Sequence, residues 1–249
     1  MAKDDRLSRV SLIPVAPLIF RQGRQLRRDT PRLPDAAQPW SGSEPGDDPV
    51  RLLVLGDSTA AGVGAQTQDD ALPGNLARTL AARFDRGVTW RAVGENGATT
   101  RILLERYLDD ALAEPADLVF LSIGANDALA IRSRAAFARD LARLIGELRR
   151  VNPAATVLVS SMPGFDQFEL LPEPLRGRLF RHARALEHAG RAVTERLDGV
   201  AMSSPAPGYT DGFFATDQFH PGPQGYREWA QWWVDDAAAA GALTEPARP

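Results

Sequence analysis

From residue 50 onward, short apolar runs alternate with longer amphipathic stretches, and this alternation restricts the chain to few folds. Most of the apolar runs are continuous, which predicts parallel strands that helices cover on both faces. Repeated strand–helix units of this kind build a three-layer α/β/α domain around a central, mostly parallel sheet. We expect five strands, at Arg51–Leu55, Val88–Val93, Leu118–Ile123, Thr156–Ser160 and Val200–Ser203.

The amphipathic stretches predict five helices, at Leu72–Arg83, Thr99–Leu112, Ser133–Arg150, Leu175–Leu197 and Gln224–Ala240. The third is the best defined, because Ser133 can cap its start and Asn152-Pro153 stops it. In open parallel sheets, reactive groups gather just beyond the carboxyl ends of the strands. The loops that follow the predicted strands are therefore where functional residues are expected.

The first 49 residues differ from the rest of the chain. Lys3, Arg6 and Arg9 precede the apolar run Leu12–Phe20, which is too short to cross a bilayer. Arginines follow the run instead of the small residues of a cleavage site, which disfavours secretion. Residues 9–28 predict either a helix that lies on an anionic membrane surface or a helix packed on the domain or a partner chain.

The predicted organisation has three parts. Residues 29–49 are rich in Pro, Gly and acidic residues and predict an irregular linker. We expect an N-terminal segment with this linker over residues 1–49, one folded domain over residues 50–240 and a tail over residues 241–249. The expected location is the cytoplasm, with or without membrane association.

Composition excludes several chemistries. The chain has 249 residues with 29 basic and 32 acidic side chains, a formal net charge of -3, so no overall positive field favours nucleic acid. It has no cysteine, which excludes disulfides, thiolate metal ligands and cysteine nucleophiles. No metal site and no cofactor are predicted.

The first predicted strand ends in Gly56-Asp57-Ser58. A serine just past a buried strand can present its hydroxyl at the edge of the sheet. The alternative is a turn followed by a helix N-cap, for which Asp and Ser are common. A serine hydroxyl becomes a useful nucleophile only with a base in reach, most often a neutral histidine.

Three histidines can supply that base. His182 and His188 are six residues apart in an arginine-rich predicted helix and are expected to be solvated or partly packed. His220 lies in a proline-rich loop before the last helix, where it can be held outside the core. Asp217 can bind one ring nitrogen of His220 and leave the other to take the serine proton. The alternative is an ordinary turn with local hydrogen bonds.

Acyl transfer also needs hydrogen-bond donors for the oxyanion of the tetrahedral intermediate. Asn126 follows the third predicted strand and can donate through its side-chain amide, whereas Asp127 is expected to be a turn residue. A glycine N–H before the second predicted helix is another candidate donor. Both Gly94 and Gly97 occur there.

Taken in order, these motifs resemble the four blocks of the SGNH/GDSL hydrolase family: Gly56-Asp57-Ser58, Gly97, Gly124-Ala125-Asn126-Asp127, and Asp217 with His220. The blocks span essentially all of residues 50–240. The resemblance implies a flavodoxin-like three-layer fold and hydrolysis of esters or related acyl groups, usually without metal.

The resemblance also implies an oxyanion hole made by the Ser58 N–H, the Gly97 N–H and the Asn126 side chain. Gly97 is preferred to Gly94 because family members tend to place Thr or Ser shortly after that glycine, as Thr99 and Thr100 are placed here.

The substrate is less constrained than the reaction. A small-molecule ester is expected, and Phe165 and Phe168, after the fourth predicted strand, are candidates for an apolar wall against its acyl chain. The alternative is that both side chains pack their loop onto the domain. Two other functions stay open: an O-acyltransferase with the same triad, and an inactive homologue that binds a ligand or a membrane.

Overall fold

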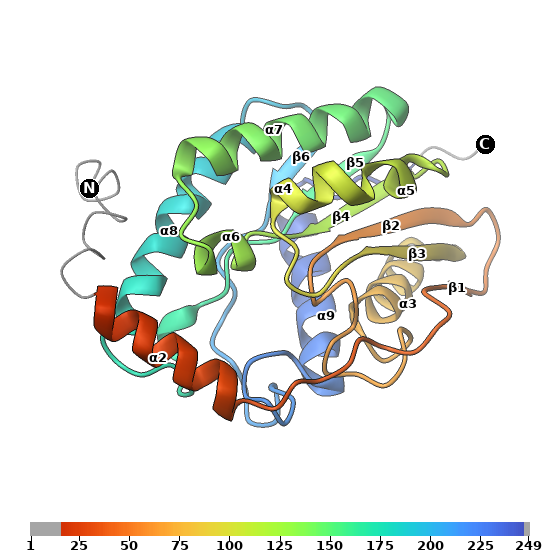
Figure 1. The fold of residues 1–249 in the computed structure, drawn as a ribbon. Helices are drawn as coiled ribbons and strands as arrows, with labels where there is room; N and C mark the ends of the chain where they lie inside the picture. Colours follow the sequence, from red (N-terminus) through yellow and green to blue (C-terminus); the bar gives the residue numbers. More distant parts are fainter. Residues whose placement is uncertain (1–15, 247–249) are drawn as a thin grey trace.

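A computed structural model describes residues 16–246 of the chain (Figure 1). Its centre is a six-stranded sheet with the order β1-β3-β2-β4-β5-β6, in which every pairing is parallel except that of β1 with β3. Helices cover both faces, so the predicted α/β/α class is confirmed. The strands are β1 Ser41–Glu44, β2 Val50–Gly56, β3 Val88–Gly94, β4 Leu118–Ser122, β5 Thr156–Val159 and β6 Val200–Met202.

The expected number of five strands was wrong, because β1 was missed. Its sequence, Ser-Gly-Ser-Glu, has no apolar or β-branched residue and lies within the stretch predicted to be an irregular linker. The strand forms at the edge of the sheet, where Gly42 faces Trp90 of β3. A β-carbon on Gly42 would come within 2.6 Å of the Trp90 ring, so tertiary pairing specifies this strand rather than local propensity.

The core has two parts, one on each face of the sheet. In β2, Leu53 and Leu55 belong to the part that α7 and α8 cover, whereas Leu52 and Val54 belong to the part that α3 and α9 cover (Figure 1). This alternation follows from the two-residue period of a strand. Helix α3 spans Leu72–Phe84, α7 spans Arg134–Val151, α8 spans Leu175–Thr194 and α9 spans Pro223–Ala239.

The helix predicted at Thr99–Leu112 is divided into three pieces. It consists of α4 (Thr100–Ile102), a π-helical turn (Leu103–Tyr107) and α5 (Leu108–Leu112). The Thr99 hydroxyl caps the start by accepting from the Ile102 N–H at 3.4 Å. Two short elements had no clear sequence signal, α6 (Ala125–Leu129) and a 3-10 turn at Phe165–Gln167.

An N-terminal helix, α2 (Ala16–Asp29), lies beside α8 (Figure 1). The Gln22 side chain donates to the carbonyl oxygen of Glu173, just before α8, at 2.8 Å. Leu18, Arg21 and Arg24 are exposed. Of the segment predicted to contact a membrane or the domain, residues 9–15 lie outside the described part. Within residues 16–246, no helix has the length and apolar character needed to cross a membrane.

The carboxyl ends of β2 and β3 are packed so closely that a side chain does not fit between them. A β-carbon on Gly94 would lie 2.0 Å from the carbonyl oxygen of Gly56. We expect Gly94→Ala to lower the free energy of unfolding by about 1–3 kcal/mol or more, because the strands must separate. Urea denaturation measures this loss.

Gly146→Ala is the matched control. Gly146 is exposed in the middle of α7, and an added β-carbon meets no atom within 4 Å. Alanine should stabilise this helix by about 1 kcal/mol, since it has the higher helix propensity. Equal stability changes in the two variants would contradict the steric interpretation of Gly94.

Candidate active site

Three loops meet at the carboxyl-terminal end of the sheet because β3, β2 and β4 are parallel neighbours. Ser58 follows β2, Gly97 follows β3 and Asn126 lies in α6 after β4. The carboxyl ends of parallel strands lie at the same end of a sheet, so the topology brings the three predicted site residues near one another.

Ser58 lies in a tight turn directly after β2, and it is only 8% exposed. Its carbonyl oxygen accepts from the Val63 N–H at 2.9 Å, and the Asp57 carbonyl accepts from the Ala61 N–H at 3.0 Å. The next helix, α3, begins much later and has Ala71 at its N-cap. The alternative role of Ser58 as a helix N-cap is therefore wrong.

Asp217 and His220 are joined directly. The Nδ1 atom of His220 lies 2.6 Å from Oδ2 of Asp217, and Oδ1 accepts from the backbone N–H groups of Phe219 and His220 at 3.0 Å each. Gln218 between them has a φ of 54°, which turns the chain back on itself. Burial raises the pKa of Asp217, but these hydrogen bonds outweigh burial and hold the pKa below its ordinary value. An ionised Asp217 favours a proton on Nδ1, which leaves Nε2 free to accept one.

The histidine loop packs against the serine loop. A β-carbon on Gly64 would come within 2.2 Å of the Pro221 carbonyl oxygen, and the Tyr226 hydroxyl of α9 donates to the Val63 carbonyl at 2.6 Å. Within residues 16–246 no hydrogen bond joins the Ser58 hydroxyl to the His220 ring. Such bonds are often long in an unliganded enzyme and shorten when substrate binds.

The Asn126 amide is oriented by a buried carboxylate. Its Nδ2 atom donates to Oδ2 of Asp57 at 3.2 Å. The other carboxylate oxygen of Asp57 accepts from the backbone N–H and the hydroxyl of Thr59, both at 3.2 Å. Burial raises the pKa of Asp57 to about 6. An amide has a second N–H, which the bond to Asp57 leaves available.

Gly94 and Gly97 occupy very different places. Gly94 is part of β3 and packs on Gly56, as described above. Gly97 has a φ of 87°, and a β-carbon there would meet nothing within 4 Å. Among the described residues, no backbone carbonyl accepts its N–H. Of the two glycines, Gly97 is the one with an N–H open to a ligand.

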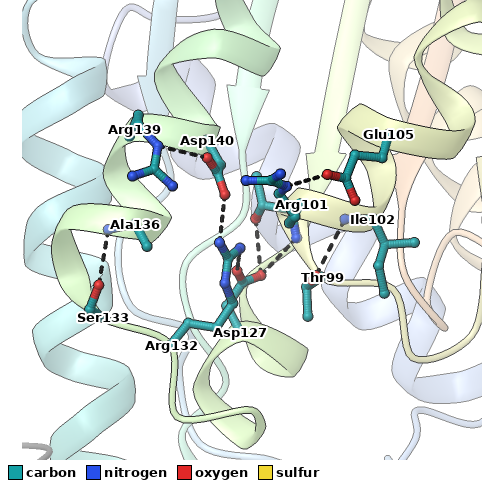
Figure 2. A network of polar contacts seen from close by, with 11 residues as sticks. Thr99, Arg101, Ile102, Glu105, Asp127, Arg132, Ser133, Ala136, Arg139 and Asp140 are labelled. Atoms are coloured by element: carbon teal, nitrogen blue, oxygen red, sulfur yellow. Dashed lines mark hydrogen bonds and ion pairs between the residues drawn. The ribbon is translucent and has the colours of Figure 1, made fainter.

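Asp127 is not the simple turn residue that we expected. Its side chain is fully buried, and Oδ2 accepts from the Thr100 N–H at 2.9 Å and the Thr100 hydroxyl at 3.0 Å. Oδ1 accepts from Arg132 at 2.7 Å (Figure 2). The only sequence signal was an arginine five residues downstream.

Phe165 and Phe168, the predicted acyl-chain wall, are 0% and 3% exposed and belong to the core. The alternative, that they pack their loop onto the domain, is the one that the structure supports. Phe168 contacts Phe219 edge-on with ring centroids 5.4 Å apart, and Phe219 contacts the His220 ring at 5.2 Å. These side chains thus support the histidine loop.

The other two histidines are not part of this group. His182 is fully buried in α8, which corrects the expectation that it is solvated or partly packed, and His188 is exposed. Within residues 16–246, no three His, Asp or Glu side chains are grouped in a way that could hold a metal ion.

Comparison with known proteins identifies the class. The sequence pattern of the GDSL-like lipase/acylhydrolase family matches residues 54–228. The GDSL-like esterase Rv1075c of Mycobacterium tuberculosis is 29% identical over 199 residues, which are 76% of this chain and 61% of that protein. The chain thus spans about three-fifths of the length of this relative.

Solved structures share the fold at low identity. LAE5, an alpha/beta hydrolase enzyme from the metagenome of Lake Arreo in Spain, has a TM-score of 0.60 and 19% identity over 80% of this chain and 98% of its own. A family 3 carbohydrate esterase of Clostridium thermocellum has a TM-score of 0.60 and 17% identity over 77% of this chain and 96% of its own.

The chain therefore belongs to the GDSL-like lipase/acylhydrolase family, as the sequence motifs predicted.

The raised pKa of Asp57 predicts a pH-dependent stability. The folded state binds this proton more tightly than the unfolded state, so the contribution is complete below about pH 4 and is lost as the pH rises through about 6. We expect Asp57→Asn to remove this dependence, so that its stability relative to the wild type rises by about 3 kcal/mol from about pH 4 to about pH 8.

Urea denaturation of both proteins across this range measures the difference. Parallel stability curves for the variant and the wild type would show that Asp57 titrates normally.

Proposed function

We propose that this protein hydrolyses carboxylic esters through a covalent acyl-enzyme on Ser58. The observation that carries the proposal is the 2.6 Å contact between His220 Nδ1 and Asp217, in a loop packed against the loop of Ser58. The carboxylate fixes the tautomer and stabilises the imidazolium that forms when Nε2 takes a proton.

In the first half of the proposed cycle, His220 Nε2 removes the proton of the Ser58 hydroxyl as Oγ attacks the ester carbonyl carbon. The carbonyl π bond becomes an oxyanion. When this intermediate collapses, the bond to the alcohol oxygen breaks, and His220 returns its proton to the departing alcohol. Water then repeats these steps on the acyl-enzyme and releases the acid, which restores Ser58 and neutral His220.

The proposed oxyanion hole combines the Ser58 N–H, the Gly97 N–H and the Asn126 side chain. Three observations support it. Gly97 has an open N–H at a positive φ, Asn126 is oriented by Asp57, and the loops of all three residues follow adjacent strands. Preorganised donors of this kind each lower the barrier by a few kcal/mol, because they are already in place when the charge develops.

We propose a small-molecule ester as the substrate. The family description names lipases and acylhydrolases, and one structural neighbour is a carbohydrate esterase, so acyl groups on lipids and on sugars are both candidate substrates. A panel of p-nitrophenyl esters of increasing chain length, with acetylated sugars, separates the two classes.

The Ser58 hydroxyl is the reacting atom in this scheme. We expect Ser58→Ala to lower kcat for p-nitrophenyl acetate by about 10³-fold or more and to abolish labelling by a fluorophosphonate probe, with an unchanged melting temperature. Ser43→Ala is the matched control, since Ser43 is exposed in β1 at the edge of the sheet. It should keep normal turnover and labelling. Normal turnover by Ser58→Ala would rule out this nucleophile.

We also propose that α2 contacts an anionic membrane surface. Arg21, Arg24 and Arg28 are exposed at a spacing of three to four residues, so they form one stripe on the helix, and exposed Leu18 lies beside it. The chain after α2 leads to the serine loop, where Ala36 N–H donates to Ala61 O at 2.9 Å. Such docking would hold the active site near a lipid surface.

Vesicle sedimentation tests this contact. The full chain should bind vesicles of phosphatidylcholine with phosphatidylglycerol and should not bind phosphatidylcholine alone. The triple variant R21Q/R24Q/R28Q should lose about 100-fold in affinity, at about 1 kcal/mol for each arginine. The control R83Q/R143Q/R196Q removes the same charge from exposed positions elsewhere and should bind normally. Equal loss in both triple variants would refute a specific role of α2.

A further inference from the structure

A network of polar contacts between charged and hydroxyl side chains links α4, α6 and α7 (Figure 2). Its centre is Asp127, which follows Asn126 in α6 and is fully buried. One oxygen of Asp127 receives both the N–H and the hydroxyl of Thr100, the first residue of α4. Thr100 is itself fully buried and comes three residues after Gly97. A single carboxylate thus joins the loop of Gly97 to the helix of Asn126.

The other oxygen of Asp127 is held by Arg132. The same guanidinium bonds to Asp140 of α7, so the contact is anchored to a long helix (Figure 2). Arg132 is 17% exposed and Asp140 is 5% exposed, so little solvent screens these pairs. Burial raises the pKa of Asp127, whereas the bonds from Thr100 and Arg132 act in the opposite direction and favour the charged form.

The turn that brings Arg132 to this position contains a strained backbone conformation. Two residues after the end of α6, Ile131 has a φ of 51°, a conformation that β-branched residues rarely adopt. The Ile131 N–H bonds to Ala128 O and the Arg132 N–H bonds to Asp127 O, both at 3.0 Å, which is the pattern of a helix end that usually requires glycine. A strained residue persists only where its surroundings compensate it, and here the turn places the guanidinium back on Asp127.

We propose that Asp127 is a positioning residue for ester hydrolysis: it holds the Gly97 N–H and the Asn126 amide at a fixed separation while charge develops on the substrate oxygen. The inference rests on the proposed oxyanion hole. Asp127 itself touches neither substrate nor Ser58. Its effect is therefore on the transition state, in which both donors must be in place, and much less on the binding of the neutral ester.

The variant Asp127→Asn tests this role. The amide can still accept from one donor, but it loses the charge that both Arg132 and Thr100 use. We expect kcat for p-nitrophenyl acetate to fall by about 10- to 100-fold, with KM within about twofold of the wild type. The affinity for an alkyl boronic acid, which forms a tetrahedral adduct with a nucleophilic serine, should fall by the same factor as kcat/KM.

Asp117→Asn is the matched control. Asp117 pairs with Arg51 through both carboxylate oxygens. It lies at the amino end of β4, which is the end of the sheet away from the proposed site. It should lower the melting temperature without changing kcat or boronic acid affinity. A normal kcat in Asp127→Asn, or a rise in KM alone, would overturn the positioning role.

Thr100→Val serves if Asp127→Asn does not fold. It removes only the hydroxyl bond to Asp127 and keeps the backbone N–H bond. We expect kcat to fall by about three- to tenfold with KM unchanged. A wild-type kcat in this variant would also refute the proposal. Activity retained by Ser58→Ala would instead overturn the proposed function, whatever Asp127→Asn does.

Discussion

The close parallel pairing of β3, β2 and β4 at their carboxyl ends is the constraint on which the site depends. Gly56 is the central contact, since a β-carbon there would lie 2.3 Å from the Ser122 carbonyl oxygen, and Gly94 approaches it from the other side. The absence of side chains at Gly56 and Gly94 lets the strands stay paired to their last residues. Ser58 then follows the central strand β2, and Gly97 and Asn126 follow β3 and β4, each one strand spacing from β2. A hydroxyl and two donors are thereby gathered from loops far apart in sequence.

Three buried aspartates at this end of the sheet have different hydrogen-bond partners. Asp217 accepts three hydrogen bonds, and its pKa is lowered. Asp127 has an arginine partner, yet its pKa is raised because burial has the larger effect. Asp57 has only neutral donors, and burial raises its pKa to about 6. The balance between desolvation and partners, rather than residue type, thus decides how each carboxylate titrates.

Most of the fold could be predicted because buried strands and helix faces need apolar residues at regular positions in the sequence. The continuous apolar runs matched β2 to β6 within about two residues, and Ser133 caps α7 as its position suggested. The strand β1 and the helix α6 could not be predicted, since each is only four or five residues long and is specified by contacts with distant residues. Ser58, Asp217 and His220 could be proposed from the sequence because a known chemistry links these residue types, and the structure joins Asp217 to His220. Asp127 was not, because its partners Thr100 and Arg132 have no chemical signature in the sequence.

The loop of His220 and the proposed oxyanion hole are supported by different physical interactions. The loop of His220 rests on aromatic side chains, with Phe219 against Phe168. Apolar packing of this kind is non-directional, and it tolerates small shifts of His220, which moves a proton between partners in the proposed cycle. Donors for an oxyanion need tighter placement, since a displacement of about 1 Å removes much of their effect. Charge-assisted hydrogen bonds are directional and short. A network centred on Asp127 is therefore better suited than apolar packing to hold the proposed oxyanion donors.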